Sequence, residues 1–543
     1  MTHGVFHVPA PKNEPVLSYA PGSPERAAIQ SRLTAMAQEQ IDVPILIGGE
    51  EIRTGRTAPM VMPHDHAHVL GHFHKAGPQE VARAIDAAEE ARADWIRMPW
   101  EERAAIFLRA AELLATTWRD TVNAATMLNQ SKTVHQAEID AACELIDFWR
   151  INVHFMERLY AEQPESAPGI WNRIEHRPLD GFVFAITPFN FTSIAGNLPT
   201  APAMLGNTCV WKPASTSVLS NYYLMKLLEE AGLPPGVINF VPGSGGEVGD
   251  PVVADRRLAG IHFTGSTDVF QGIWRRIGDN IREYAQYPRI VGETGGKNFV
   301  FAHASAAPRA LATALVRGAF EYQGQKCSAA SRAYIPQSLW GEVRDIMGAQ
   351  CSEIGVGDVQ DFHNFMGAVI DASSYSKLSR AIDGARADST ADVVIGGEYD
   401  DATGWFVKPT VVTVKDPRHD LMRTEFFGPL LSVFVYDDAR FEETLELCAS
   451  TSAYGLTGAI FGTDRAALRQ GLEALRFAAG NFYVNDKPTG AVVGQQPFGG
   501  SRASGTNDKA GSMLNLMRWV SQRTIKETFV PPTDFRYPFM DRE

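Results

Sequence analysis

The stretch Phe182-Val183-Phe184-Ala185-Ile186 decides the fold class, because it is apolar at every position and directly follows Gly181. A strand with one face in water would alternate apolar and polar residues, whereas a continuous apolar run fits a strand buried on both faces. Similar runs follow, each separated from the last by enough residues for a helix, at 209–211, 237–241 and 261–263. This alternation predicts an α/β fold with a parallel sheet covered by helices on both sides.

A second series of strand-like and helical stretches begins near Asn298 and continues to about Gly505, which predicts a second α/β domain. Its strands are expected at 299–301, 411–414, 431–434 and 482–484. Upstream of both series, residues 79 to about 130 are predicted to be helical, because one helical face collects the apolar residues Ile106, Ala110, Leu113 and Leu114. Two segments fit neither series, 163–179 and 520–543, and both are predicted arms that pair with another subunit.

Composition and charge exclude several classes of protein. The chain has 543 residues, of which 45% are hydrophobic and 21% charged, as in ordinary globular proteins. The net charge of −13 disfavours nucleic acid and anionic membranes as partners. No apolar run reaches the roughly 18 residues of a membrane helix, and the first thirty residues resemble neither a secretory nor a mitochondrial signal. Five cysteines without CxxC spacing favour a reducing compartment, so we expect a cytoplasmic protein.

Five of the 14 histidines lie within one short segment, at 64, 66, 68, 72 and 74. Their spacing of two places several on one face of a strand, where neutral imidazoles bind zinc or nickel. The segment contains no cysteine and no Glu-x-x-His pattern, and Pro63 and Gly71 mark turns around it. We therefore predict a solvated strand and no metal site.

Cys327 is the candidate nucleophile, because its neighbours are polar. Lys326 and Ser328 flank it, and a cation beside a thiol favours the thiolate. The alternative is a small buried residue, which is the commonest environment of a free cysteine. We accept that alternative for Cys143 and Cys209, which stand in apolar patterns.

Glu293 is the candidate general base, because it follows an apolar run and has glycines around it in 291–298. Glycines let the backbone approach a ligand and free a carboxylate to move, as a base acting on water requires. A turn carboxylate in solvent is the equally weighted alternative. The segment is not a phosphate loop, because Val291 and Asn298 break that pattern.

Two further glycine-containing turns follow apolar runs. The segment 243–249 has Val248 where a dinucleotide fingerprint needs glycine, so we interpret it as a sharp turn from strand to helix. The segment 263–266 offers backbone N–H groups at the start of a helix, which suits a pyrophosphate.

Taken in order, seven segments resemble the motif series of the aldehyde dehydrogenase superfamily: 187–191, 211–213, 263–266, 292–297, 324–328, 425–429 and 497–500. Four more resemble the branch of that superfamily that oxidises L-glutamate γ-semialdehyde, formed from Δ1-pyrroline-5-carboxylate: 13–16, 22–26, 136–140 and 504–509. The resemblance implies a Rossmann-type NAD-binding domain at 1–162 and 180–292, a catalytic domain at 293–508, and a β-arm for oligomerisation at 163–179 and 520–543.

The resemblance implies a mechanism for the candidate residues. The Cys327 thiolate attacks the aldehyde carbon, and the Asn190 side-chain amide and the Cys327 backbone N–H hold the resulting oxyanion. NAD accepts the hydride, and Glu293 activates the water that hydrolyses the thioester. The cofactor-binding residues that the resemblance implies are Lys212, Ser215, Thr264, Gly265, Ser266, Glu425 and Phe427. Many NAD-specific relatives have Glu at the position of Ser215, so this serine weakens the case against NADP, but NAD is the cofactor we expect.

The resemblance also assigns the substrate site. The carboxylate is expected at Ser328, Gly490 and Ala491, the ammonium at Glu138, and the aliphatic chain between Phe191 and Phe498. Phe191 and Phe498 as core aromatics, and Glu138 as a helix-face carboxylate, are the alternatives. The expected assembly is at least a homodimer, with transient contact to a proline dehydrogenase allowed. Competing functions are a broader aldehyde dehydrogenase and a superfamily member without catalysis.

Overall fold

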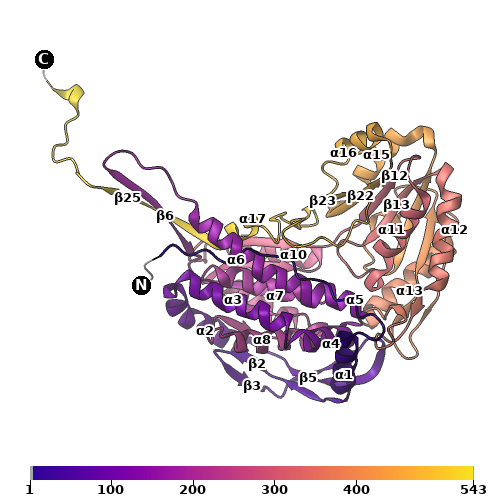
Figure 1. Ribbon diagram of the computed structural model, residues 1–543, viewed down its shortest axis with the longest axis horizontal. Coiled ribbons are helices and arrows are strands. Elements are labelled where there is room, and N and C mark those ends of the chain that lie inside the picture. Colours follow the sequence, from indigo (N-terminus) through magenta and orange to yellow (C-terminus); the bar gives the residue numbers. More distant parts are fainter. Residues whose placement is uncertain (1–3, 542–543) are drawn as a thin grey trace.

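The structure is a computed structural model that describes residues 4–541 (Figure 1). Two α/β units follow one another along the chain, and a two-stranded ribbon projects from the first. Residues 1–3 of the first predicted domain and 542–543 of the second predicted arm lie outside the described residues. Within 4–541, no helix combines the length and the apolar character needed to cross a membrane.

The first unit is built on a seven-stranded sheet of order β11-β10-β7-β8-β9-β2-β3. Its five consecutive strands β11, β10, β7, β8 and β9 run parallel, and β2 and β3 add an antiparallel edge. The predicted apolar runs form the central strands and are buried throughout, as a sheet covered on both faces requires. The bounds are β2 (Ile45–Ile47), β3 (Glu50–Ile52), β7 (Phe182–Ile186), β8 (Thr208–Lys212), β9 (Ile238–Phe240), β10 (Leu258–Thr264) and β11 (Arg289–Glu293).

Helices cover both faces of this sheet. One core contains side chains of alternate strand positions, such as Val183, packed against α7 (Thr192–Met204) and α8 (Val218–Ala231). The other core contains the intervening positions, such as Phe184, with α2 (Pro78–Arg97), α9 (Gly245–Ala254) and α10 (Thr267–Asp279). The predicted helical region 79–130 forms α2, α3 (Trp100–Ala115) and α4 (Arg119–Gln130). The helices α3 and α4 lie in an outer layer together with α6 (Leu145–Ala161).

The second unit has its own seven-stranded sheet, of order β16-β19-β20-β13-β12-β22-β23. All neighbours are parallel except β16, which pairs antiparallel with β19. The strands are β12 (Asn298–Ala302), β13 (Ala330–Pro336), β16 (Ala391–Ile395), β19 (Thr410–Val414), β20 (Leu430–Tyr436), β22 (Thr457–Phe461) and β23 (Asn481–Val484). One face packs on α11 (Pro308–Phe320) and α12 (Gln337–Glu353), and the other on α13 (Ala372–Ala387) and α15 (Phe441–Thr451).

The two predicted arms pair with each other. The strand β6 (Ile170–Pro178) lies antiparallel to β25 (Val520–Thr528), with Ile170 opposite Thr528 at the far end. Figure 1 shows this ribbon extending away from both sheets. The residues after β25 continue outward without a sheet partner as far as the described chain extends.

The histidine segment is not the solvated strand that its pattern predicts. It spans β5 (Asp65–His74), which pairs with β4 (Thr57–Met62), and begins just before β5. His64 and His74 are buried. Both have hydrogen-bonding partners: Nδ1 of His64 lies 3.1 Å from Ser131 Oγ, and Nδ1 of His74 accepts from the backbone N–H of Gly55 at 3.1 Å. Among the described residues, no group of three or more ligating side chains is arranged to hold a metal ion.

Candidate active site

The carboxyl ends of the parallel strands bring several predicted residues to one edge of the first sheet. Lys212 at the end of β8 is paired with Ile186 at the end of β7. On the other side of β7, Ile186 is paired with Phe263 of β10, and the next residue, Thr264, is paired with Glu293 of β11. The segment 187–191 therefore leaves the sheet between Lys212 on one side and Thr264 on the other, with Glu293 on the strand beyond Thr264.

The amino ends of strands in the second sheet face this edge. Cys327 lies just before β13, and Glu425 lies a few residues before β20. Asn298, the first residue of β12, donates its side-chain amide to the carbonyl of Cys327 at 2.7 Å. The backbone N–H of Gly296 donates to Oε1 of Glu425 at 2.8 Å. A Cβ at Gly296 would lie 2.5 Å from the Cys327 carbonyl oxygen, so only glycine permits this approach.

The surroundings of Cys327 favour the thiol, contrary to the prediction from its neighbours. Burial raises the pKa of Cys327 to about 12, and the carboxylates of Glu293, Glu425 and Glu144 add to the shift. Lys326 does not offset them, because its ammonium lies 3.1 Å from a carboxylate oxygen of Glu321. The nucleophile therefore needs a group that removes its proton.

Asn190 is held beside the nucleophile loop. Its side chain is buried, and Nδ2 donates to the carbonyl of Gln325 at 3.0 Å. Gln325 is itself fixed, because its side-chain oxygen accepts from the backbone N–H of Ile370 at 2.9 Å. The Asn190 amide has a second N–H, so it can also donate to an oxygen that develops negative charge next to Cys327.

Glu293 ends β11 and is held from the second unit. Its Oε2 accepts from the backbone N–H of Gly500 at 2.8 Å. Burial raises the pKa of Glu293 well above its ordinary value, although this hydrogen bond and Lys509 act in the opposite direction. A carboxyl group with a raised pKa, placed within the electrostatic reach of Cys327, suits proton transfer to and from water.

The other edge residues suit a dinucleotide. Lys212 is half-buried, its ammonium contacts only the Pro213 carbonyl at 3.2 Å, and burial lowers its pKa to about 8. The helix α10 begins after Ser266, whose side chain does not cap it, so the first-turn N–H groups remain available to an anion. Ser215 is exposed and lies close to Lys212 in the sequence. The backbone N–H of Gly265 donates to the Glu293 carbonyl at 3.2 Å. The Lys212 ammonium and the first-turn N–H groups of α10 fit ribose hydroxyls and a pyrophosphate, whereas the Gly265 N–H is already engaged.

The second unit supplies the remaining predicted cofactor residues. Phe427 has a left-handed backbone, with φ of 58°, and its ring lies edge-on to Phe189 with centroids 5.8 Å apart. This contact joins the 425–429 segment to the 187–191 segment. Glu425 is half-buried, and burial raises its pKa.

Of the predicted substrate residues, Ser328 lies beside the segment that contains Gly490 and Ala491. The hydroxyl groups of Ser328 and Thr489 lie 2.8 Å apart, and Thr489 immediately precedes Gly490 and Ala491. Gly490 has φ of 94°, a conformation that favours glycine. Phe191 is half-buried beneath the ammonium of Lys132, which lies 4.4 Å from its ring centroid, and half-buried Phe498 exchanges backbone hydrogen bonds with Ala510.

Glu138 is occupied elsewhere, so the structure does not support its predicted contact with an ammonium group. Its side chain is fully buried and forms an ion pair with Arg119. It also accepts from the Tyr19 hydroxyl at 2.8 Å, the Leu17 N–H at 2.9 Å and the Asn123 amide at 3.0 Å. Burial opposes the charged form, but the hydrogen bonds from Arg119 and these neighbours lower the pKa of Glu138. Glu138 is therefore a structural carboxylate.

Glu144 is the acidic residue on this helix that the sequence reasoning missed. It ends the seven-residue π-helical segment η1 (Glu138–Glu144) and accepts from the Ser193 hydroxyl at 3.1 Å. Burial, followed by the nearby Asp140, raises its pKa to about 8, and its charge contributes to the raised pKa of Cys327. An acid inside the otherwise apolar run 141–146 was the signal available in the sequence.

Comparison with known proteins agrees with this arrangement. Residues 52–525 match the aldehyde dehydrogenase family. The chain is similar to the mitochondrial Δ1-pyrroline-5-carboxylate dehydrogenase of Dictyostelium discoideum, with 51% identity over 98% of this chain and 96% of the relative. The Δ1-pyrroline-5-carboxylate dehydrogenase of Agaricus bisporus is 51% identical over 98% of each chain.

A solved structure is similar over the whole length. The Δ-pyrroline-5-carboxylate dehydrogenase of Mycobacterium tuberculosis, determined with NAD bound, superimposes with a TM-score of 0.96. Its sequence is 56% identical, and the match covers 100% of both chains. The arrangement of two sheets and a ribbon is therefore shared with that protein.

Proposed function

This chain belongs to the aldehyde dehydrogenase family, and on that premise we propose that it oxidises L-glutamate γ-semialdehyde to L-glutamate with NAD. The semialdehyde is the open form of Δ1-pyrroline-5-carboxylate, so the activity belongs to proline catabolism. One arrangement supports it above all: Cys327, Asn190 and Glu293 converge where the carboxyl edge of the first sheet meets the amino edge of the second.

Cys327 is the proposed nucleophile. Its pKa of about 12 keeps it as a thiol at rest, so the thiol must release its proton to solvent as the sulfur attacks the aldehyde carbon. The carbonyl oxygen becomes an oxyanion that accepts from the Asn190 amide and the Cys327 backbone N–H. One such donor contributes about 2.7 to 4 kcal/mol to transition-state stabilisation.

Hydrolysis completes the reaction. NAD supplies the hydride acceptor that turns the hemithioacetal into a thioester. Glu293 then takes a proton from water as the water attacks the thioester carbonyl, and the Cys327 thiolate leaves and is reprotonated. The product is a carboxylate, so the overall reaction oxidises the aldehyde.

The cofactor contacts follow from the edge of the first sheet. Lys212 is proposed to donate to the adenosine ribose, and the turn Thr264-Gly265-Ser266 with the N-terminus of α10 to hold the pyrophosphate. Glu425, held by Gly296, is proposed to accept from the nicotinamide ribose, with Phe427 beside it. Ser215 carries no negative charge against a 2′-phosphate, so NADP is the cofactor to compare.

The proposed substrate site selects its substrate through polar and charged groups at its two ends and apolar side chains between them. Ser328 and the N–H groups of Gly490 and Ala491 are proposed to bind the carboxylate. Glu144 replaces Glu138 as the carboxylate proposed to face the ammonium, because Glu144 acts on Cys327 and Glu138 is enclosed by Arg119. The rings of Phe191 and Phe498 are proposed to enclose the aliphatic chain. An aldehyde without these charges leaves polar groups unpaired and is discriminated against.

The ribbon and the segment after it are proposed to join two subunits in a homodimer. Large apolar side chains are exposed on this part of the chain, including Trp171, Phe529, Phe535 and Phe539. Exposed apolar groups gathered on a projecting element are typical of an interface. Light scattering should give twice the chain mass for the full protein, and the monomer mass after removal of residues 529–543. A monomeric full-length protein would contradict the proposal.

A cytoplasmic location is proposed because all five cysteines are free, which suits a reducing compartment. Transient contact with a proline dehydrogenase is proposed because that reaction class supplies the substrate.

A substrate panel tests the activity. NADH formation is measured with Δ1-pyrroline-5-carboxylate, propanal and butanal, each with NAD and NADP. We expect kcat/KM for the semialdehyde to exceed that for propanal by at least about 100-fold, since charge-assisted contacts contribute about 1.5 to 3 kcal/mol each. Equal values for both aldehydes would favour a broader aldehyde dehydrogenase.

A further inference from the structure

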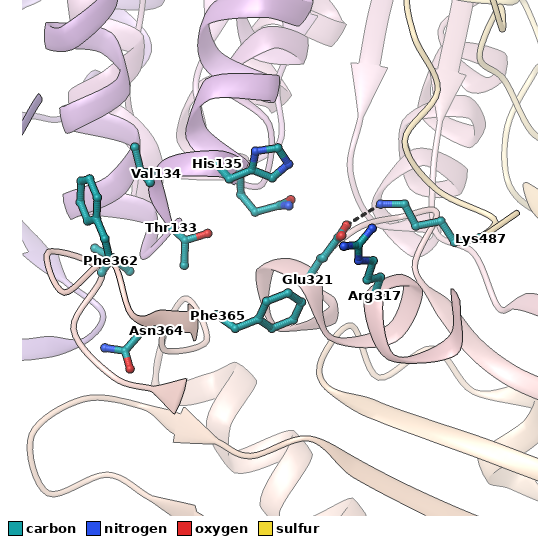
Figure 2. Close-up of a pocket in the computed structure, with 11 residues that line it drawn as sticks. Thr133, Val134, His135, Arg317, Glu321, Phe362, Asn364, Phe365 and Lys487 are labelled. Atoms are coloured by element: carbon teal, nitrogen blue, oxygen red, sulfur yellow. Dashed lines mark hydrogen bonds and ion pairs between the residues drawn. The ribbon is translucent and has the colours of Figure 1, made fainter. Parts of the chain in front are cut away.

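A cavity lined by residues outside the proposed substrate site lies between the two units. It has a volume of about 440 Å³ and lies between the start of α5 (Val134–Ala137), the end of α11 and the loop before β15 (Asn364–Met366). Figure 2 shows Arg317, Glu321 and Lys487 at one end of this cavity, and Phe362 and Asn364 at the other. We call it the Arg317 cavity.

Positive charge exceeds negative charge at the polar end of the Arg317 cavity. Glu321 is its acidic residue, and a carboxylate oxygen of Glu321 lies 2.8 Å from Nζ of Lys487 and 3.1 Å from Nζ of Lys326. Between residues 4 and 541, no acidic side chain forms an ion pair with the exposed Arg317. One carboxylate therefore stands against two ammonium groups and a guanidinium. This local excess is opposite in sign to the net charge of −13.

Two lysines connect the charged end of the Arg317 cavity to the proposed substrate site. The ammonium of Lys487 lies close to the proposed carboxylate-binding residue Gly490: a Cβ at Gly490 would be 3.9 Å from Nζ of Lys487. Lys326, bound to the same Glu321, directly precedes Cys327. The charged end of the Arg317 cavity therefore adjoins the segments that contain Gly490 and Cys327.

The remaining lining is apolar. Val134, Val359, Phe362 and Phe365 surround the space opposite the charged groups. The guanidinium of Arg317, which pairs with no described acidic side chain, lies at one end of the cavity, and aliphatic and aromatic side chains lie at the other. This arrangement fits a short aliphatic chain that ends in a carboxylate.

We propose that the Arg317 cavity binds a short-chain aliphatic carboxylate through Arg317 and captures the substrate's carboxylate before it reaches Ser328 and Gly490. The link to catalysis rests on the proposed function. The cavity attracts an anion that the rest of this acidic protein repels, so it raises the rate of productive encounter.

The kinetic test reverses one charge. Arg317→Glu is compared with Arg309→Glu, which changes an exposed arginine two turns earlier on α11, outside the cavity. We expect Arg317→Glu to lower kcat/KM for the semialdehyde about fivefold through KM, to leave propanal unchanged, and to flatten the dependence of kcat/KM on NaCl. Arg309→Glu should match the unmodified protein. Equal losses for both aldehydes, or no loss, would overturn the proposal.

A binding test is independent of enzymatic activity. Phenylglyoxal labels accessible arginines, and peptide mass spectrometry quantifies the label on Arg317 and Arg309. Glutarate should protect Arg317 and not Arg309, whereas the neutral glutaramide should protect neither. Absence of protection, or equal protection by glutaramide, would overturn carboxylate binding even if the semialdehyde is oxidised. Protection in a protein that does not oxidise the semialdehyde would retain the site and reject the proposed function.

Discussion

Oε2 of Glu293 accepts a hydrogen bond from the backbone N–H of Gly500 at 2.8 Å, which ties the last residue of β11 to a loop more than two hundred residues later. This contact holds the carboxyl group in a buried position at the edge where the two sheets face each other. Within the described residues, Oε1 of Glu293 accepts no hydrogen bond, which leaves this oxygen available for proton transfer.

Replacement of the nucleophile should abolish turnover. Cys327→Ala removes the proposed nucleophile, so we expect at least a 10⁴-fold (about 5.5 kcal/mol) loss of NADH formation. Circular dichroism and the melting temperature should stay close to those of the unmodified protein. Cys351→Ala, a partly buried cysteine on α12, is the matched control and should keep full activity. Residual turnover in Cys327→Ala would exclude a covalent route.

Removal of the neighbouring carboxylate should make the thiol more reactive. Glu293→Gln removes a negative charge that raises the pKa of Cys327, so the thiolate fraction at a given pH should increase. We expect iodoacetamide to alkylate the variant about three- to tenfold faster at pH 9, and the two proteins to converge at low pH, where Glu293 is neutral. Slower alkylation in the variant at pH 9 would show that Glu293 activates the resting thiol.

Loss of the side-chain oxyanion donor should lower the chemical rate. Asn190→Ala removes the amide that the Gln325 carbonyl positions, and we expect kcat to fall about 10²- to 10³-fold with little change in KM. Because Asn190 is buried, the melting temperature is measured alongside. A kcat within about threefold of the unmodified value would assign the oxyanion to other donors.

Glu138 and Glu144, at the two ends of the π-helical segment, should give opposite results. Measured above pH 8, where Glu144 is ionised, Glu144→Gln should raise KM for the semialdehyde about tenfold and leave propanal unchanged, since a charge-assisted hydrogen bond is lost. Glu138→Gln should leave KM unchanged but lower the free energy of unfolding by about 3 to 5 kcal/mol, because Arg119 loses its buried partner. Urea unfolding and steady-state kinetics on both variants check the assignment, and the reverse pattern would restore Glu138 as the substrate contact.

Acid should remove the stabilisation from Glu321. Burial opposes its ionisation, but Lys326 and Lys487 lower its pKa from 4.5 to about 2, so its contribution is complete above pH 4.5 and is lost as the pH falls toward 2. Glu321→Gln should therefore lower the free energy of unfolding, measured with urea at pH 7, by about 3 kcal/mol. The difference in unfolding free energy between the two proteins should shrink between pH 4.5 and 3. A difference that does not depend on pH would mean that packing, and not charge, is lost.

The apolar runs were sufficient to predict the fold. Runs such as 182–186 and 299–301 have no polar face, so they are stable only inside a sheet covered on both sides, and they form β7 and β12 there. The order of the motifs likewise identified the family, because local chemistry at Cys327, Glu293 and Asn190 is readable one residue at a time.

Only the tertiary structure decided where charged side chains point. Lys326 adjoins Cys327 in sequence but turns to Glu321, Glu138 turns to Arg119 while Glu144 acts on the thiol, and the two arms pair with each other across more than three hundred residues. Sequence neighbours constrain the backbone, whereas the energy of a charge depends on burial and on partners that are distant along the chain. These partners become neighbours only when both sheets are assembled.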